Sequence, residues 1–328
     1  MNRYVELKAK DNTELGHQLG EIFHDRLKAK LERVRGAEWN RKRKIALPHW
    51  AVTKRHFPAY ADELVAYARA AGLGWQDLWT FNLEIGMDAE RCTSMVTNRG
   101  KLIGHVEDFD PSSVDDLFLI RKTVGRTTVL DLNYFHTLGG NAASVNSHGW
   151  AQLVNTLHGP TRRAGIPRNV IARWLSESQD PERDARRLGR LPRMDGYAHT
   201  FVHADGRAFS LEVAAEAFSF SKASSPFVHA NHYLSSLAAQ ETFRSASSTD
   251  RFEVATCKLK PRMTVDAIKK LMGDQSRGKG KSILNDDTIG KMVVDFKRHE
   301  AQAWFKAAPR KGYLAVPLNF LDKKTALS

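Results

Sequence analysis

Cys92 is the residue of this sequence whose type and surroundings most favour chemistry. It is one of two cysteines in a chain of 328 residues and lies within Glu90-Arg91-Cys92-Thr93-Ser94. The segments before it have helical spacing, whereas β-branched or aromatic runs follow it. A thiol at such a boundary could be a nucleophile, although an isolated cysteine is more often a small apolar core residue. Both interpretations stay open at this point.

Two further side chains have types suited to acyl chemistry. Asn231 ends a predicted strand, where its amide could donate to an oxyanion or simply cap a turn. Arg310 lies in a predicted hairpin near the end of the sequence, either as a solvated surface charge or as a fixed cation beside a carboxylate. Asp108 is the carboxylate that we expect Arg310 to pair with.

The elements that must position these residues fall into blocks. Helical periodicity predicts helices over residues 13–34, 60–71, 75–85, 166–178, 181–188, 239–257 and 264–273. Short runs separated by turn residues predict strands over 92–98, 101–109, 116–124, 127–135, 143–155, 198–205, 208–215 and 225–234, and a final hairpin over 303–318. Many antiparallel strands with helices in separate blocks indicate a layered α+β fold.

Composition narrows the class of protein. Hydrophobic residues make up 42% of the chain, which is enough for a sizeable core. No apolar run approaches the roughly 20 residues of a membrane span, and the N-terminal segment has no signal-type apolar stretch, so we expect a cytoplasmic protein without membrane contact. The net charge of +13 comes from short, scattered basic clusters without interleaved aromatic residues, which favours a solvated surface over a nucleic-acid site. Two cysteines are too few for a structural zinc site, and we expect no metal.

These segments, in this order and spacing, resemble the isopenicillin-N (acyl-CoA:6-aminopenicillanic acid) acyltransferase-like family, a branch of the N-terminal-nucleophile (Ntn) hydrolases. The similarity covers nearly the whole chain. It rests on Thr13-Glu14-Leu15-Gly16, the segment 57–64, Leu78 to Glu84, Cys92-Thr93-Ser94, Gly104 to Phe109, Asn146 to Gly149, Val154-Asn155, Gly165-Ile166-Pro167 and His229 to His232. The usual form of the strand over 104–109 has asparagine where this chain has Val106.

The resemblance implies a fold and a mechanism. The fold is the four-layer αββα arrangement with two packed antiparallel sheets. The chain is expected to cut its own Arg91–Cys92 bond, which leaves residues 1–91 as a helical pro-segment or small subunit and 92–328 as the catalytic part of one integrated domain. The freed α-amino group of Cys92, with a typical pKa of about 7.7–8.0, would then act as general base to its own thiol.

The resemblance also implies roles for other residues. Asn231 would stabilise the oxyanion, and Asp108, paired with Arg310, would orient the amine or thiol. We predict that Thr93, His105 and Asn155, which belong to matched segments, bind the substrate. That substrate would be a small-molecule acyl amide or acyl-CoA, no cofactor is required, and a homo-oligomer is possible.

Two functional interpretations follow. In the first, the chain is an autoproteolytic cysteine acyltransferase or amidohydrolase that works through an acyl-enzyme on Cys92. In the second, the same scaffold is an unprocessed, non-catalytic binding protein for an anionic partner. The second arises because residue 91 is arginine where the best-known family members have glycine.

Overall fold

The computed structural model describes residues 3–85, 92–161 and 164–321. Its strands form two sheets. The larger sheet has the order β1 (Tyr4–Ala9), β4 (Leu117–Val124), β5 (Thr127–Tyr134), β6 (Ala143–Asn146), β7 (Trp150–Thr156), β8 (Tyr197–His203), β9 (Ala208–Val213) and β10 (Phe218–Lys222). The smaller sheet has the order β11 (Phe227–His229), β2 (Thr93–Thr97), β3 (Leu102–Asp108), β12 (Thr288–Asp295), β13 (Glu300–Phe305) and β14 (Leu314–Pro317).

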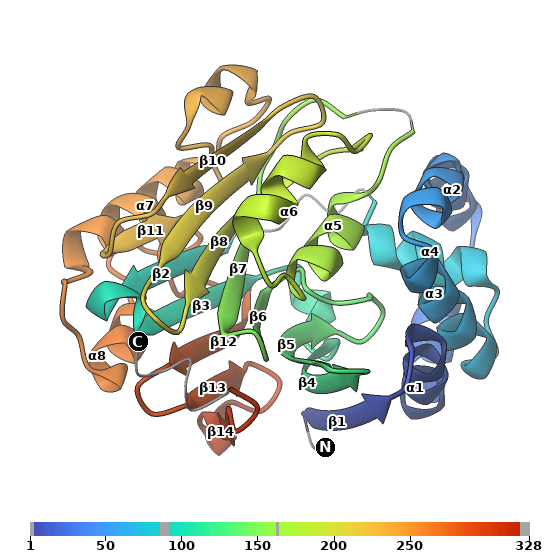
Figure 1. Cartoon of the computed structure of the whole chain (residues 1–328), viewed down its shortest axis with the longest axis horizontal. Coiled ribbons are helices and arrows are strands. Elements are labelled where there is room, and N and C mark those ends of the chain that lie inside the picture. The colour runs from blue at the N-terminus through green and yellow to red at the C-terminus, as the bar shows by residue number, and fades with distance from the viewer. Residues whose placement is uncertain (1–2, 86–91, 162–163, 322–328) are drawn as a thin grey trace.

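Helices lie on the outer side of each sheet. The first group is α1 (Asn12–Val34), α2 (Ala37–His56), α3 (Pro58–Ala70), α4 (Trp75–Leu83), α5 (Arg168–Leu175) and α6 (Pro181–Leu188), and the second is α7 (Ala246–Lys258) and α8 (Val265–Leu271). Figure 1 shows α1 to α4 at one side of the molecule and α7 and α8 at the other. Short 3-10 helices span Asn98–Gly100, Pro111–Ser113, Ser236–Gln240 and Pro309–Lys311.

Three apolar cores lie between the four layers, because side chains along each strand point alternately to the two faces of its sheet. In β4, Phe118 and Ile120 face the first helix group, whereas Leu117 and Leu119 face the smaller sheet. In β2, Val96 belongs to the core between the sheets. Successive side chains of a strand point to opposite faces, so neighbouring strand residues enter different cores. The predicted αββα architecture is therefore confirmed.

The smaller sheet meets α7 and α8 through the third core. Met95 of β2 and Val106 of β3 pack there against Ala255 and Ile268 of the two helices. Even-numbered residues of β2 and odd-numbered residues of β3 consequently face the other sheet. The position of a residue along β2 or β3 therefore decides whether its side chain points toward the larger sheet or toward α7 and α8.

Some elements differ from the prediction. Residues before Cys92 are not helical throughout, because Tyr4–Ala9 forms β1, which pairs with β4 in parallel, while the other pairs are antiparallel. Three further elements were not predicted: α2, β10 and β12. The helix predicted over 239–257 begins only at Ala246, where the Ser245 side chain accepts a hydrogen bond from the Ser248 amide. The division of the chain before Cys92 stays a prediction, since residues 86–91 lie outside the described part.

The close packing of α1 on α3 leads to a stability prediction. A Cβ added at Gly16 would lie 2.1 Å from the Glu63 carbonyl oxygen. The helices must therefore move apart in the Gly16→Ala variant, and we expect urea denaturation to show a loss of about 1–3 kcal/mol in the free energy of unfolding. Gly74→Ala is the control, because its new methyl group would meet only side-chain atoms at 3.4 Å. Equal losses in both variants would contradict this explanation.

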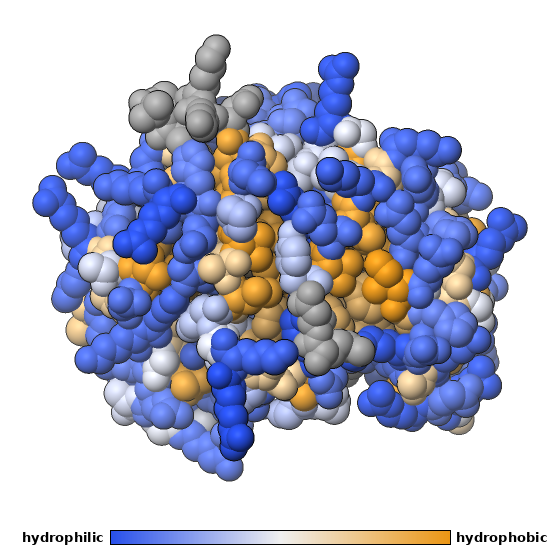
Figure 2. All heavy atoms as spheres, turned by 90° about the horizontal axis from the view of Figure 1, so that it is seen from below, coloured by the Kyte–Doolittle hydropathy of each residue, from blue (hydrophilic) through white to orange (hydrophobic). Residues whose placement is uncertain are grey.

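The surface mixes polar and apolar residues. On the face seen from below, hydrophilic side chains stand out around the edge and apolar residues gather across the middle (Figure 2). Within the described ranges, no helix combines the length and the apolar character that crossing a membrane requires.

Candidate active site

The fold places the Cys92 thiol between the two sheets. Cys92 directly precedes β2, an inner strand held by β11 on one side and β3 on the other, and its side chain is only 3% exposed. The β2–β3 register pairs Thr93 with Val106, which sets Cys92 across from Glu107. A residue held by an inner strand has little freedom to move, so the sheet fixes the position of the sulfur.

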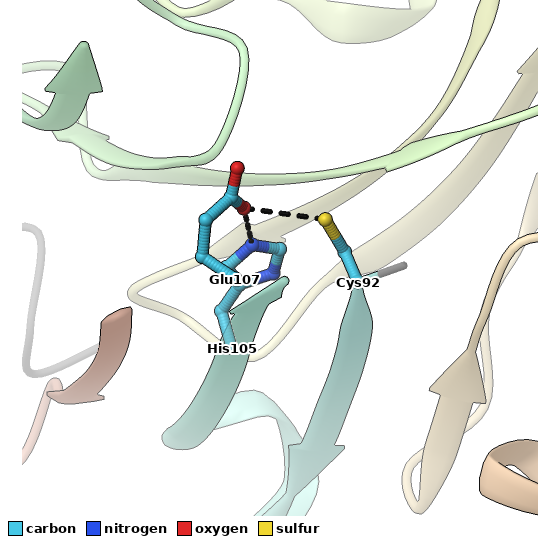
Figure 3. A group of neighbouring side chains, drawn as sticks. All are labelled: Cys92, His105 and Glu107. Atoms are coloured by element: carbon cyan, nitrogen blue, oxygen red, sulfur yellow. Dashed lines mark hydrogen bonds and ion pairs between the residues drawn. The ribbon is translucent and has the colours of Figure 1, made fainter. Parts of the chain in front are cut away.

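Three side chains converge at this point. The Cys92 Sγ donates to Glu107 Oε2 at 3.2 Å, and His105 Nε2 lies 2.8 Å from the same oxygen. Figure 3 shows the sulfur and the imidazole, from neighbouring strands, both directed at the carboxylate. We call Cys92, His105 and Glu107 the thiol cluster. All three are buried.

A second ring of polar groups holds the thiol cluster from both sheets. The Tyr134 hydroxyl of β5 donates to Glu107 Oε1 at 2.6 Å. Ser94 Oγ lies 3.1 Å from His105 Nδ1 and donates to Asn155 Oδ1 of β7 at 2.7 Å. Buried polar groups cost free energy unless they are hydrogen-bonded, and here each oxygen of the Glu107 carboxylate has a partner. The cluster is therefore a preorganised polar site between the two sheets.

The other face of β2 carries a buried guanidinium. Arg251 of α7 is fully buried and donates from Nη1 to the Cys92 carbonyl oxygen at 2.7 Å and to Thr93 Oγ1 at 2.9 Å. Its Nη2 donates to Asn231 Oδ1 at 2.9 Å. The amide of Asn231 in turn donates from Nδ2 to the Thr156 carbonyl oxygen at 3.1 Å. Arg251 thus fixes the main chain at Cys92 together with two of the predicted site residues.

Asp108 also faces α7, because it follows Glu107 on β3 and points the opposite way. Its carboxylate accepts hydrogen bonds from Asn285 Nδ2 at 2.9 Å and from the Thr288 hydroxyl at 2.6 Å. Burial raises the pKa of Asp108 to about 6, although the Arg251 charge and the two hydrogen bonds act in the opposite direction. This carboxylate therefore changes its charge near pH 6.

Arg310 does not pair with Asp108. The 3-10 helix Pro309–Lys311 holds it in the turn between β13 and β14, where its side chain is exposed and lines a surface cavity with Arg3, Arg26 and Asp115. Asp108, by contrast, is 0% exposed. The expected pairing is wrong for a physical reason: helix α7 brings the buried Arg251 guanidinium to this side of the strand instead.

The structure thus sorts the predicted site residues into two groups. His105 and Asn155 join Cys92 between the sheets, whereas Thr93 and Asn231 contact Arg251, and Asn231 also reaches β7 of the larger sheet through the Thr156 carbonyl. Sequence reasoning missed four residues, which are Ser94, Glu107, Tyr134 and Arg251. Helical periodicity in the sequence could have indicated Arg251, because it shares one helix face with the buried Ser247, Val254 and Ala255.

The pKa of Asp108 leads to a prediction about pH. Its pKa is raised from 3.8 to about 6 in the folded chain, so burial of the ionised form costs stability. That cost is absent below pH 4 and complete above pH 6, and it amounts to about 3 kcal/mol. Arg251 and Glu107 also act on this carboxylate, and Lys291, whose own pKa burial lowers to about 8, lies near it.

Asp108→Asn removes the titration and leaves the other groups in place. We expect the unfolding free energy of the variant, minus that of the unaltered chain, to rise by about 3 kcal/mol between pH 4 and pH 7. Urea denaturation of both proteins across this range measures the difference. A difference that is constant with pH would show that Asp108 does not titrate as stated.

Comparison with known proteins adds the family context. The model of the family described as acyl-coenzyme A:6-aminopenicillanic acid acyl-transferase matches residues 96–305, which is more than half of the chain. A search of curated proteins found no significant match.

Two solved structures are similar in outline. Penicillin V acylase from Agrobacterium tumefaciens aligns with a TM-score of 0.48 and 9% sequence identity, over 71% of this chain and 88% of that one. A mutant of conjugated bile acid hydrolase from Clostridium perfringens aligns with a TM-score of 0.43 and 9% identity, over 70% of this chain and 92% of that one.

Proposed function

Because the chain belongs to the acyl-coenzyme A:6-aminopenicillanic acid acyl-transferase family, we propose that it forms an acyl-enzyme on Cys92 and passes the acyl group to water or to an amine. The observation that supports this most strongly is the thiol cluster. A lone buried cysteine needs no charged neighbours, yet this one donates to a buried carboxylate that also contacts an imidazole. A carboxylate in this position can accept the thiol proton as the sulfur becomes a nucleophile.

The first step is self-cleavage before Cys92. The thiol attacks the carbonyl carbon of residue 91, and its proton passes to Glu107 Oε2. The C–N bond then breaks, the nitrogen takes up the proton, and the acyl group is held on sulfur as a thioester. This bond cleavage frees the α-amino group of Cys92, and water then hydrolyses the thioester, which restores the thiol and releases residue 91 as a carboxylate. Arg91 itself lies outside the described residues.

The second step uses the same sulfur on a substrate. With the α-amino group or Glu107 as proton acceptor, Cys92 Sγ attacks the acyl carbon of an amide or thioester. The tetrahedral oxyanion then collapses, and the leaving nitrogen or sulfur receives the proton. One well-placed donor to such an oxyanion is worth about 2.7–4 kcal/mol in the activation barrier. We assign this role to Asn231, whose amide has a second N–H besides the one bonded to the Thr156 carbonyl.

The other residues position these groups. Arg251 donates to the Cys92 carbonyl and to Asn231, so it couples the nucleophile to the proposed oxyanion donor. Asp108 lies on the same side and feels the Arg251 charge. His105 and Asn155 stay our candidates for substrate contact on the opposite side of β2, and Thr93 stays a candidate beside Arg251.

The acceptor decides between hydrolysis and transfer. We suggest incubating the purified protein with a panel of N-acyl amides and acyl-CoA thioesters, with and without a primary amine, and identifying the products by mass spectrometry. Transfer predicts an acylated amine that increases with amine concentration at the expense of free acid. Free acid alone would assign hydrolysis, whereas no turnover of any acyl compound would contradict the proposal. The second interpretation, an unprocessed binding protein for an anionic partner, gains no comparable support.

A further inference from the structure

We propose that the thiol cluster also binds one divalent cation of the zinc type, and that the bound metal blocks the nucleophile. The chemistry of the donors is the first argument. A thiol sulfur, an imidazole nitrogen and a carboxylate oxygen are the three ligand types that Zn²⁺ takes in proteins. Mg²⁺ and Ca²⁺ prefer oxygen ligands throughout and are disfavoured here.

The geometry of the donors is the second argument. The three candidate ligand atoms all lie within 4.8 Å of one another. Glu107 Oε2 is 3.2 Å from Cys92 Sγ and 2.8 Å from His105 Nε2. Tetrahedral zinc with bonds of about 2.0–2.3 Å places its ligands roughly 3.3–3.5 Å apart. The two contacts of Glu107 Oε2 are about 0.1–0.5 Å shorter than the lower of these separations, and the sulfur and the imidazole nitrogen lie within 4.8 Å of each other.

The outer partners are the third argument. In metal sites the ligand atoms are oriented by hydrogen bonds to the far side of each ligand. Here the Tyr134 hydroxyl holds Glu107 Oε1 at 2.6 Å, and Ser94 Oγ holds His105 Nδ1 at 3.1 Å. The two atoms left over, Oε2 and Nε2, contact each other, and Oε2 also contacts the sulfur (Figure 3).

Metal binding also depends on pH, because a thiol must lose its proton and an imidazole must be neutral before either can bind a metal. Loading of the thiol cluster should therefore release protons, and the affinity for the metal should rise with pH.

Co²⁺ titration of the purified, chelator-treated protein tests the binding step without any substrate. We expect one Co²⁺ per chain, a sulfur-to-cobalt charge-transfer band in the near ultraviolet, and loss of that band when Zn²⁺ is added. Calorimetry in buffers of different ionisation enthalpy should show that Zn²⁺ binding releases protons. Absence of the band, or a band that Zn²⁺ does not remove, would overturn the site.

Variants assign the ligands. Cys257→Ser is the matched control, because Cys257 is exposed on α7, and it should bind as the unaltered chain does. Cys92→Ser should lose the band. Tyr134→Phe keeps all three ligands and should weaken binding by about 10–100-fold while the band persists. A band that survives Cys92→Ser but not Cys257→Ser would place the metal elsewhere.

The proposal that bound zinc inhibits turnover rests on the proposed function, and the experiments distinguish the failure of one from the failure of the other. Turnover should fall in proportion to Zn²⁺ occupancy and return on addition of chelator, because a metal-bound sulfur cannot attack a carbonyl. Metal binding that leaves turnover intact would overturn the inhibition while the site itself stands. An inactive protein that still shows the cobalt band would contradict the acyl-transfer proposal alone.

Discussion

Cys92→Ala leaves a single uncut chain without measurable acyl transfer or hydrolysis. The substitution removes the sulfur that attacks residue 91 and the substrate, so we expect the turnover rate to fall at least a thousandfold, as when nucleophiles are removed from other enzymes. Intact-mass measurement detects the uncut chain, and the product assay measures the rate. Since the side chain loses only one atom, unfolding should change by no more than about 1–2 kcal/mol.

Cys257→Ser controls for a general effect of losing a thiol. Cys257 is exposed at the end of α7, away from the hydrogen bonds of the thiol cluster. Its variant should be cut and active at the unaltered rate. If Cys92→Ala were still cut and active, Cys92 could not be the nucleophile. If both variants lost activity, the role of Cys92 would not be specific.

Glu107→Gln should have the second-largest effect. Glutamine keeps the size of the side chain and can still bond to Tyr134 and His105, but it cannot take the thiol proton. Removing a positioned proton acceptor typically costs about 10²–10⁴ in rate. We expect that loss in kcat with little change in KM, because Glu107 acts on the sulfur rather than on the bound substrate.

Glu107→Asp and the pH profile separate catalysis from structure. Aspartate restores the charge on a shorter side chain and should recover part of the lost rate. The rate of Glu107→Gln should depend on pH differently from that of the unaltered chain, while thermal unfolding confirms that both variants are folded. A Glu107→Gln rate within threefold of the unaltered rate would remove Glu107 from the mechanism.

Elements with strong local patterns could be predicted from the sequence. Helix α1 has apolar residues at helical spacing, from Leu15 to Leu31, and the structure confirms it within a residue or two. Helix α2 was missed because its apolar residues are sparse and Pro48 lies within it. Strand β1 was missed because its partner β4 follows more than a hundred residues later. Propensity carries no information about such a distant pairing.

Local sequence patterns were also insufficient to predict which single residues form the candidate site. Cys92 could be found because it marks the change from helix to strand. Glu107 and Asp108 are adjacent acidic residues in a strand that is buried on both faces, so the sequence could not say which one faces the sulfur. The choice between Arg251 and Arg310 likewise depended on which helix or turn reaches the helix-covered side of the smaller sheet, and tertiary packing alone decides that.

Rapid-quench mass spectrometry during turnover tests the role of Cys92 most directly. A chain cut before Cys92 and mixed with an acyl-CoA or N-acyl amide should carry one acyl group on the fragment that begins with this residue. The adduct should be labile to hydroxylamine, as a thioester is, and should disappear as product forms. Turnover by a full-length chain, or an adduct on any other residue, would contradict a nucleophile at the new chain terminus.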